Sequence, residues 1–396
     1  MSAVRDDFAI VMRTFWPVSP VVGEGMMQVS ENLSCDFQCR VITQDQQDVK
    51  FEAKRLNRGP RVLFSPIYAF SNSSSNMLVR LLDLIWFAVA VFFILILRRP
   101  RVVYVATDPP LLVPIVVAVY AKVLRAEYVY HVQDIHPEAT AVVFPKFKQS
   151  FFRHVFEVLR LIDNWVVKNA FMVITLTVEM SDSLKARGGL KSFTVRYINN
   201  PSAALHNIDK ESRYDFSFVG NAGRLQLIPL VLAAVRKYLI EGGTRKFAFA
   251  GAGVMSNELR KIAAEFPKNV SYFGKVPVDQ ATQITLSSEW ALLPIDDEVC
   301  AYAFPSKAST YAVSGKPILA ICGENTSVAK WINSNDLGVV VKPDLSELVD
   351  FFKRAERFNE LTQWKHDQER EKVLDQLSTQ QFVTGVVRSL RDAAKH

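Results

Sequence analysis

The stretch FSFVGNAGRLQ at residues 216–226 decides how this chain folds. A short, mostly apolar run at 216–219 leads straight into the glycine-rich turn 220–224. Such a run is typical of a strand in a parallel sheet that helices cover on both faces. The glycines let backbone N–H groups approach a diphosphate, the following helix N-terminus favours the anion, and Arg224 adds charge. A tight strand-to-helix turn also needs glycine, so packing is the alternative.

Similar strand-like runs recur along the chain, separated by segments with helical spacing. The expected strands cover residues 8–12, 39–43, 61–65, 102–106, 128–132 and 172–176 in the first half, and 216–219, 246–250, 270–273, 291–294, 317–321 and 338–341 in the second. Strands that alternate with helices predict doubly wound α/β units. Ligands bind beyond the carboxyl ends of such strands, so two facing sheets predict a site in the cleft between two domains.

Length and composition agree with two domains. The chain has 396 residues, 49% of them apolar and 22% charged, which is enough for two globular cores. Turn-forming residues at 197–201 mark the boundary. We expect an N-terminal domain over 1–200 and a C-terminal domain over 201–379. The last segment, 380–396, has helical spacing and is expected to pack back on the first domain.

The surplus of basic residues indicates an anionic partner. The net charge is +7, and no zinc-finger spacing or recognition helix is present, so a membrane surface is favoured over nucleic acid. Four scattered cysteines without a C-x-x-C pair are typical of a cytosolic protein with reduced thiols. The first residues lack the cationic start and cleavage site of a signal peptide.

Residues 84–97, LIWFAVAVFFILIL, form the single candidate membrane segment. A spanning helix needs about 20 apolar residues, and upstream extension would place Arg80 and Asp83 in hydrocarbon. We therefore expect a helix that is part core and part interfacial, with Trp86, Arg98 and Arg99 at headgroup level. A fully buried helix is the equal alternative.

Two further loops in the second half carry glycine or lysine after a strand. Gly251-Ala252-Gly253, after the run 246–250, resembles a dinucleotide fingerprint, although backbone packing explains its glycines as well. Ser306 and Lys307 follow Pro305 at a helix start. A lysine in a first turn opposes the helix dipole, which indicates a nearby anionic ligand; an ordinary surface lysine is the alternative.

In the first half, Asp134 and Glu138 lie in the segment QDIHPE, residues 133–138, directly after the run 128–132. Carboxylates at a strand's carboxyl end are placed for catalysis or substrate positioning, although they also cap helices. Gly23-Glu24-Gly25 is expected to form a loop that meets an acceptor, or a simple turn. The chain contains no P-loop, G-x-S-x-G or H-E-x-x-H motif, and no metal site or cofactor is expected.

These motifs together resemble those of the bacterial members of glycosyltransferase family 4, especially the enzymes that build O-antigen and capsule repeat units. The resemblance covers nearly the whole chain. It is carried by the turn 107–110, the segment 134–138 (D-L-W-P-E in the relatives), Ile198-Asn199-Asn200, the loop 220–226, and PSK at 305–307 with Tyr311 and Gly315-Lys316-Pro317.

The resemblance implies a GT-B fold, which has two Rossmann-like domains facing an inter-domain cleft. It also implies a retaining, metal-independent transferase of the hexosyltransferase type. The nucleotide-sugar, which we expect to be a UDP-sugar, would bind the second domain. Its diphosphate would meet Gly220, Asn221, Gly223 and Arg224, with Ser306 and Lys307 beside it, and Asp134 would orient the acceptor or support the oxocarbenium-like transition state. From the residues themselves, we further expect Gly251, Gly253 and Thr310 in the donor site, Glu138 beside Asp134, and Gly23, Glu24 and Gly25 at the acceptor.

Three positions depart from the family pattern. Most relatives have two carboxylates eight residues apart, where this chain has Tyr302 and Thr310, and Leu227 replaces the usual helix-start glycine. A neutral hydroxyl binds ribose less strongly than a carboxylate.

The expected acceptor is a saccharide on a polyprenyl diphosphate at the cytoplasmic face of the cell membrane, where the protein would be peripheral. The alternatives are a GT-B-fold sugar-nucleotide epimerase and a non-catalytic homologue that binds a nucleotide-sugar or a partner enzyme. A dinucleotide dehydrogenase fits poorly because no proper fingerprint opens either half.

Overall fold

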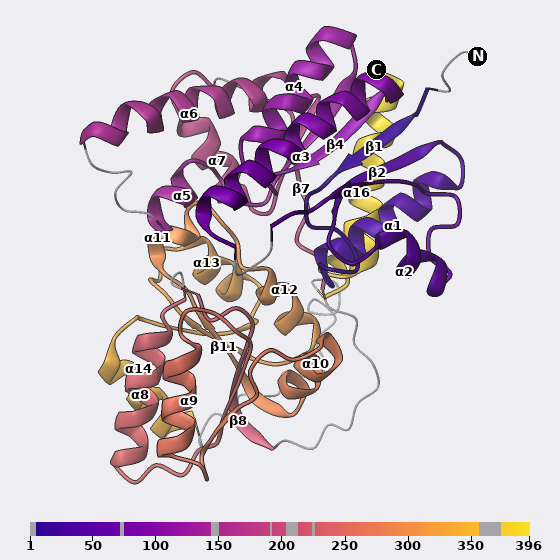
Figure 1. The fold of residues 1–396 in the computed structure, drawn as a ribbon. Coiled ribbons are helices and arrows are strands. Elements are labelled where there is room, and N and C mark those ends of the chain that lie inside the picture. Colours follow the sequence, from indigo (N-terminus) through magenta and orange to yellow (C-terminus); the bar gives the residue numbers. More distant parts are fainter. Residues whose placement is uncertain are drawn as a thin grey trace. The chain divides into compact units, whose positions relative to one another are not determined.

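The computed structural model describes residues 5–71, 75–143, 150–190, 192–202, 213–223, 226–355 and 374–396. The chain divides into two compact units. Unit 1 combines residues 1–200 with 379–396, and unit 2 covers 201–378. Each unit contains one parallel sheet with helices packed against it (Figure 1).

Unit 1 alternates strands and helices along most of its length. Its elements are β1 (Phe8–Val11), α1 (Val22–Ser34), β2 (Cys39–Asp45), α2 (Val49–Arg55), β3 (Leu63–Tyr68), α3 (Met77–Arg98), β4 (Val102–Ala106), α4 (Leu112–Leu124), β5 (Glu127–Val132), α5 (Glu138–Val143), α6 (Ser150–Asn169), β6 (Met172–Thr175), α7 (Val178–Ala186), β7 (Val195–Tyr197) and α16 (Thr379–Lys395).

The strands of unit 1 lie in the order β3-β2-β1-β4-β5-β6-β7, and all neighbouring pairs are parallel. Ile10 of β1 is in register with Val41 on one side and Tyr104 on the other. The chain moves outward from β1 to β3 and then crosses back through α3 to β4. The direction of winding therefore reverses between β1 and β4, and ligands bind at such a switch point in doubly wound sheets.

Unit 2 repeats this arrangement with six strands. Its elements are β8 (Tyr214–Val219), α8 (Ile228–Ile240), β9 (Phe247–Ala250), α9 (Ser256–Glu265), β10 (Val270–Tyr272), α10 (Val278–Leu286), β11 (Ser288–Pro294), α11 (Asp297–Cys300), α12 (Ser306–Val313), β12 (Ile318–Ile321), α13 (Ser327–Ser334), β13 (Gly338–Val341) and α14 (Leu345–Arg354). The sheet order is β10-β9-β8-β11-β12-β13, so the winding reverses between β8 and β11.

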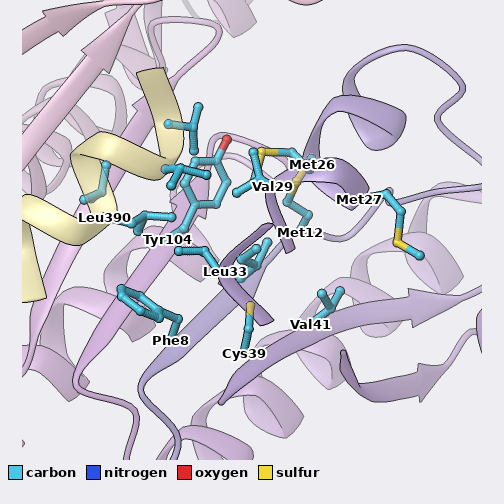
Figure 2. Packing of buried hydrophobic residues seen from close by; sticks show 14 of the residues in the cluster. Phe8, Met12, Met26, Met27, Val29, Leu33, Cys39, Val41, Tyr104 and Leu390 are labelled. Atoms are coloured by element: carbon cyan, nitrogen blue, oxygen red, sulfur yellow. The ribbon is translucent and has the colours of Figure 1, made fainter. Parts of the chain in front are cut away.

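The C-terminal helix α16 is part of the core of unit 1. Its side chain Leu390 is buried in one cluster with Phe8 and Tyr104 of the sheet (Figure 2). Phe382 of α16 belongs to the same cluster. Arg196 of the edge strand β7 forms an ion pair of 3.0 Å with Asp392 of α16. The last helix therefore packs on the sheet of unit 1, although unit 2 separates this helix from the rest of unit 1 in the sequence.

The structure adjusts several sequence predictions by a few residues. A seventh strand, β7, forms one edge of the first sheet and ends at Tyr197, where the turn-forming residues 197–201 begin. Residues 23–25 were expected in a loop; this is wrong, because they lie in the first turn of α1. The apolar run 84–97 belongs to a longer helix that begins at Met77, where the Asn76 side chain accepts a hydrogen bond from the Val79 amide.

Candidate functional site

The switch point of unit 2 is built around the end of β8. The Tyr311 hydroxyl, from α12, accepts a hydrogen bond of 3.1 Å from the Val219 amide and donates one of 3.0 Å to the Val219 carbonyl. This pair of bonds fixes the position of α12 against the last residue of β8. Because Lys307 lies one turn before Tyr311 on α12, its side chain reaches the turn at Gly220.

Lys307 places a buried ammonium group at this switch point. Its Nζ lies 4.2 Å from the centroid of the Phe218 ring, and a Cβ at Gly220 would be 3.0 Å from that nitrogen. Among the described residues, Nζ has no hydrogen-bond partner. Burial lowers the pKa of Lys307 to about 7. A buried amine without a partner is costly to the fold and gains free energy when an anion binds beside it.

The glycine-rich turn after β8 uses most of its amides internally. The Gly220 amide donates to the Ala250 carbonyl at 3.0 Å, and the Ala222 amide donates to the Ala252 carbonyl at 3.1 Å. The Gly223 amide donates to Gln226 Oε1 at 2.8 Å. Two of the amides expected to face a diphosphate, those of Gly220 and Gly223, are therefore already engaged. Asn221 lies in the same turn, and Arg224 lies outside the described residues.

Gly251 and Gly253 have a packing role in the loop after β9. A Cβ on Gly251 would lie 1.8 Å from the Gly220 carbonyl oxygen, and one on Gly253 would lie 2.3 Å from that of Ala222. No larger residue fits at either position without displacing the turn. These glycines therefore support the shape of the 220–223 turn, which is the packing alternative that the sequence left open.

The remaining predicted donor residues of unit 2 lie on or near α12. Ser306 is the exposed first residue of the helix, and Pro305 precedes it without a side-chain cap. Thr310 is on the same helix, one turn after Lys307. Tyr302 follows α11 and is partly exposed. The structure thus brings Gly220, Lys307 and the start of α12 together at the end of β8.

The switch point of unit 1 joins the ends of three strands. After β1, the Thr14 amide donates to Asp108 Oδ2 at 3.0 Å, which ties the turn after β1 to the turn after β4. Thr107 Oγ1 accepts hydrogen bonds from the amides of Gln133 (3.1 Å) and Asp134 (3.3 Å), which follow β5. The carboxyl ends of β1, β4 and β5 therefore form one bonded edge.

Asp134 presents its carboxyl group at this edge. Part of the residue is in contact with solvent, while neighbouring protein atoms displace water from around its carboxyl group. The loss of surrounding water and the negative charge of Asp108 raise the pKa of Asp134 to about 6. A carboxyl group with a pKa near neutrality can accept or release a proton during a reaction, so the position suits the catalytic role expected of it.

Glu138 is held in a buried ion-pair network instead of being free. Arg187, at the end of α7, lies 2.6 Å from Glu138 and 2.5 Å from Asp163. It also donates a hydrogen bond of 2.8 Å to the His136 carbonyl. Tyr130 donates to the other oxygen of Asp163 at 3.0 Å. Arg187 therefore fixes the shape of the segment that carries Asp134.

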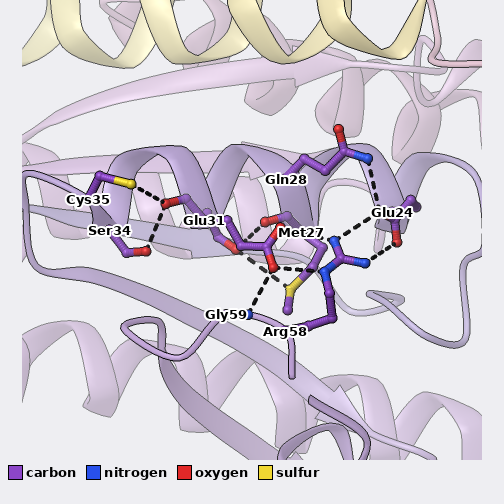
Figure 3. A network of polar contacts seen from close by, with 9 residues as sticks. Glu24, Met27, Gln28, Glu31, Ser34, Cys35, Arg58 and Gly59 are labelled. Carbon is purple, nitrogen blue, oxygen red and sulfur yellow. Dashed lines mark hydrogen bonds and ion pairs between the residues drawn. The ribbon is translucent and has the colours of Figure 1, made fainter. Parts of the chain in front are cut away.

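The three residues expected at the acceptor are already packed at the start of α1. A Cβ on Gly23 would lie 2.7 Å from the Trp16 amide nitrogen. Glu24 is 2.9 Å from Arg58, which also pairs with Glu31 (Figure 3). Gly25 is buried. The Glu24 carboxylate thus has a structural partner within unit 1.

The residues expected at a membrane are exposed. Trp86 lies on the outer side of α3, Arg98 ends that helix, and the Arg99 carbonyl accepts a hydrogen bond from Arg5. Within the described part of the chain, α3 is the one helix long and apolar enough to cross a membrane, and 28% of its most apolar window is buried.

Sequence reasoning missed three residues that shape these edges. Asp108 was noted only as part of a turn, Tyr311 only as part of a motif, and Arg187 was not singled out. Asp108 could have been found from the long apolar connection between the third and fourth strands, because such a crossover creates the switch point. No local signal identifies Arg187, since its carboxylate partners lie 24 and 49 residues away.

Comparison with known proteins agrees with this architecture. The chain is 25% identical over 271 residues to the probable glycosyltransferase WbjE of Pseudomonas aeruginosa, a match that spans 64% of this chain and 66% of that protein. No protein-family model matches the chain. Because the match spans just under two thirds of the relative, the activity of that protein is transferred to this chain only as a proposal.

Solved structures share the fold over nearly their whole length. A glycosyltransferase from Rickettsia africae superimposes with a TM-score of 0.65 at 14% identity, covering 98% of this chain and 99% of that one. Anabaena Alr3699/HepE in complex with UDP-glucose gives a TM-score of 0.64 at 12% identity, covering 97% and 99%. The prediction of a GT-B fold with two Rossmann-like domains is confirmed, and similarity to glycosyltransferases is supported by sequence and fold.

Proposed function

We propose that this chain is a retaining, metal-independent hexosyltransferase of the family 4 type that transfers a sugar from a UDP-sugar to a lipid-linked saccharide. In this reaction, the bond between the anomeric carbon and the β-phosphate oxygen breaks as the acceptor oxygen bonds to that carbon. The acceptor hydroxyl loses its proton to the departing diphosphate. The products are the extended saccharide and UDP, so no further reactant is required.

One observation carries the proposal: Lys307 holds a buried amine at the switch point of unit 2 that has no hydrogen-bond partner in the part of the chain that the structure describes. The leaving group of glycosyl transfer is a nucleoside diphosphate, whose negative charge grows in the transition state. A fixed cation in a site of low dielectric constant stabilises that charge more strongly than it stabilises the substrate. Gly220 leaves the space for this amine because it has no Cβ. Ser306, Asn221 and Arg224 are proposed to complete the diphosphate site.

In unit 1, Asp134 is the proposed catalytic group on the acceptor side. Its raised pKa and the proximity of Asp108 suit a carboxyl group that orients the acceptor hydroxyl and supports positive charge at the anomeric carbon. Glu138 acts through Arg187, so its proposed part is to position the segment and not to react. Gly23, Glu24 and Gly25 are proposed to border the acceptor.

The choice of UDP is supported by the likeness in fold to Alr3699/HepE, which binds UDP-glucose. The proposed acceptor is a saccharide on a polyprenyl diphosphate, as in the assembly of O-antigen or capsule. Such an acceptor lies in the cell membrane, so we place the protein at the cytoplasmic face as a peripheral protein. The exposed apolar side of α3 supports this location.

A matched pair of lysine variants tests the proposal. Thermal unfolding is measured with UDP, GDP, dTDP and their sugar conjugates, without metal, for the wild type, Lys307→Met and Lys330→Met. Lys330 is an exposed lysine on α13 of the same unit. We expect one nucleotide to stabilise the wild type and the Lys330 variant, and the Lys307 variant to bind it about 100-fold more weakly, since a charged hydrogen bond is lost.

The same experiment separates the alternatives. A nucleotide that stabilises all three proteins equally would contradict a site at Lys307. Stabilisation by a UDP-sugar without release of UDP in the presence of saccharide acceptors would favour a non-catalytic binding protein, and exchange at the sugar carbon with UDP retained would favour an epimerase. No response to any nucleotide would contradict the donor site itself.

A further inference from the structure

Apart from Arg80, every exposed residue of α3 before Arg98 is apolar. Met77 is 82% exposed, Phe93 59% and Leu97 68%, with Trp86 exposed between them. The opposite side packs Phe87, Val91 and Leu95 into the core of unit 1. One helix therefore serves as core on one side and leaves a large apolar strip on the other, which soluble monomers rarely expose.

Two neighbouring helices extend this strip into a broad surface. Helix α4 contacts α3, and α6 contacts α4 (Figure 1). Val123 of α4 and Val158 and Leu161 of α6 are exposed. Together, the exposed apolar residues of these three helices form a surface that we call the three-helix face. Sequence reasoning identified only the α3 part, because α4 and α6 expose few apolar residues each.

Within the described part of unit 1, the charges beside the three-helix face are largely positive. Arg98 and Arg99 end α3, and Lys122 and Arg125 end α4; all four are exposed. Helix α4 contains no acidic residue, and the single one in α3, Asp83, is fully buried. In α6, Glu157 pairs with Arg160 and Asp163 is buried. Apolar side chains with cations beside them complement a bilayer that has anionic headgroups.

Asp83 joins α3 to the acceptor edge. Its carboxylate is 3.0 Å from Arg13 and also accepts hydrogen bonds from the Phe70 amide and the Ser71 hydroxyl. Arg13 follows β1, and its neighbour Thr14 donates to Asp108. These bonds hold the first turns of α3 beside the carboxyl ends of the strands. They also keep the start of the helix on the sheet.

We infer that the three-helix face lies flat on an anionic bilayer and holds the edge with Asp108 and Asp134 at the level of the lipid headgroups. Helices α3 and α4 both run antiparallel to β4, because each is joined to it by a short connection. When these helices lie flat on the membrane, the strands of the sheet are parallel to the membrane surface, and their carboxyl ends open to the side. The diphosphate of a membrane lipid lies at that same level. The role of the edge rests on the proposed function.

Three glutamate substitutions test this orientation. Phe93→Glu changes α3 and Leu161→Glu changes α6. Phe51→Glu is the matched control, because Phe51 is also 59% exposed but lies on α2 of unit 1. Binding to vesicles with 30 mol% phosphatidylglycerol is measured by co-sedimentation. We expect Phe93→Glu and Leu161→Glu each to weaken binding at least about tenfold, since a charge replaces an inserted apolar side chain, and the control to change it less than about twofold.

Several outcomes would overturn the inference. An effect of Phe93→Glu without one of Leu161→Glu would mean that α3 binds alone. Equal binding to uncharged phosphatidylcholine vesicles would contradict the part assigned to the cations. A dimer that Phe93→Glu dissociates, with no vesicle binding, would mean that a second copy covers the face. UDP binding is measured on the same samples without vesicles, so failure of the donor site and failure of membrane binding are read separately.

Discussion

Two buried cations, Arg187 in unit 1 and Lys307 in unit 2, have opposite surroundings. Arg187 is paired with Glu138 and Asp163 and also bonds to a backbone carbonyl. Lys307 faces the ring of Phe218 and has no hydrogen-bond partner among the described residues. Both side chains lie near the carboxyl ends of the strands in their sheets. They therefore differ in the groups that surround the charge and not in their position in the fold.

The comparison separates structural charge from functional charge. A buried cation that is paired with two carboxylates fixes the segments that it joins, and a ligand gains little there. A buried cation without a partner destabilises the fold until an anion arrives, so its presence indicates binding. Removing Arg187 should therefore lower the free energy of unfolding, whereas removing Lys307 should raise it.

The largest effect is expected for Arg187→Met. This substitution leaves Glu138 and Asp163 as unpaired, partly or fully buried carboxylates, and we expect a loss of about 3–5 kcal/mol in the free energy of unfolding. Denaturant titration measures it. Arg236→Met is the control, because Arg236 pairs with Glu265 on the surface of unit 2 and should contribute less than about 1 kcal/mol. Equal losses for the two variants would contradict a special role for the Arg187 network.

Asp134→Asn tests the segment that Arg187 holds. We expect turnover to fall about 100- to 1,000-fold with UDP affinity unchanged, because the substitution removes a titrating carboxyl on the acceptor side only. The wild-type rate should rise as pH increases through about 6, where Asp134 ionises. Asp182→Asn, an exposed change on α7, is the control. A rate profile without this step would contradict the assignment.

Lys307→Met should stabilise the protein, in contrast to Arg187→Met. The pKa of Lys307 is about 7 in the folded protein and 10.5 in the unfolded chain. Between pH 7 and pH 10.5, the unfolded chain therefore carries a proton on this amine that the folded protein lacks. The stability of the wild type therefore rises with pH across this window. We expect the variant to gain on the order of 2 kcal/mol at pH 6 and to lose that advantage toward pH 10. A destabilised variant at pH 6 would mean that Lys307 has a partner.

The smallest effect concerns the glycine beneath the amine. Gly220→Ala would place a Cβ 3.0 Å from Lys307 Nζ, at a φ of +141°, and should weaken nucleotide binding about tenfold by displacing that amine. Gly274→Ala is the matched control: it also has a positive φ, of +66°, but nothing lies within 4 Å of its Cβ. Isothermal titration compares the two. If both variants bind the nucleotide with the same reduced affinity, backbone strain explains the loss, and contact between the new Cβ and the Lys307 amine does not.

The sequence predicts the sheets better than the site. The GT-B fold follows from short apolar runs that alternate with helices, and β4 and β13 have the predicted bounds. Local patterns succeed there because strand burial is encoded in neighbouring residues. The expectation of free amides in the turn 220–223 failed for Gly220 and Gly223, because their partners come from the loop after β9 and from Gln226.

Long-range contacts explain what the sequence could not provide. Lys307 was singled out because its position opposes the helix dipole, but its burial depends on Phe218 and Gly220, almost 90 residues earlier. The Arg187 network joins α5, α6 and α7, and the three-helix face exists only once α3, α4 and α6 pack side by side. The burial of Lys307, the Arg187 network and the three-helix face all depend on residues far apart in the sequence, so no single segment contains a pattern that predicts them.

Calorimetric titration of UDP at pH 8 tests most directly whether Lys307 binds the diphosphate of a nucleotide-sugar. Measurements in two buffers of different ionisation enthalpy give the number of protons taken up on binding. Because Lys307 with a pKa of about 7 is mostly neutral at pH 8, a bound diphosphate should recharge it, and we predict an uptake of close to one proton. Lys307→Met should bind weakly and take up none. Tight UDP binding without proton uptake, equal in both proteins, would contradict the account.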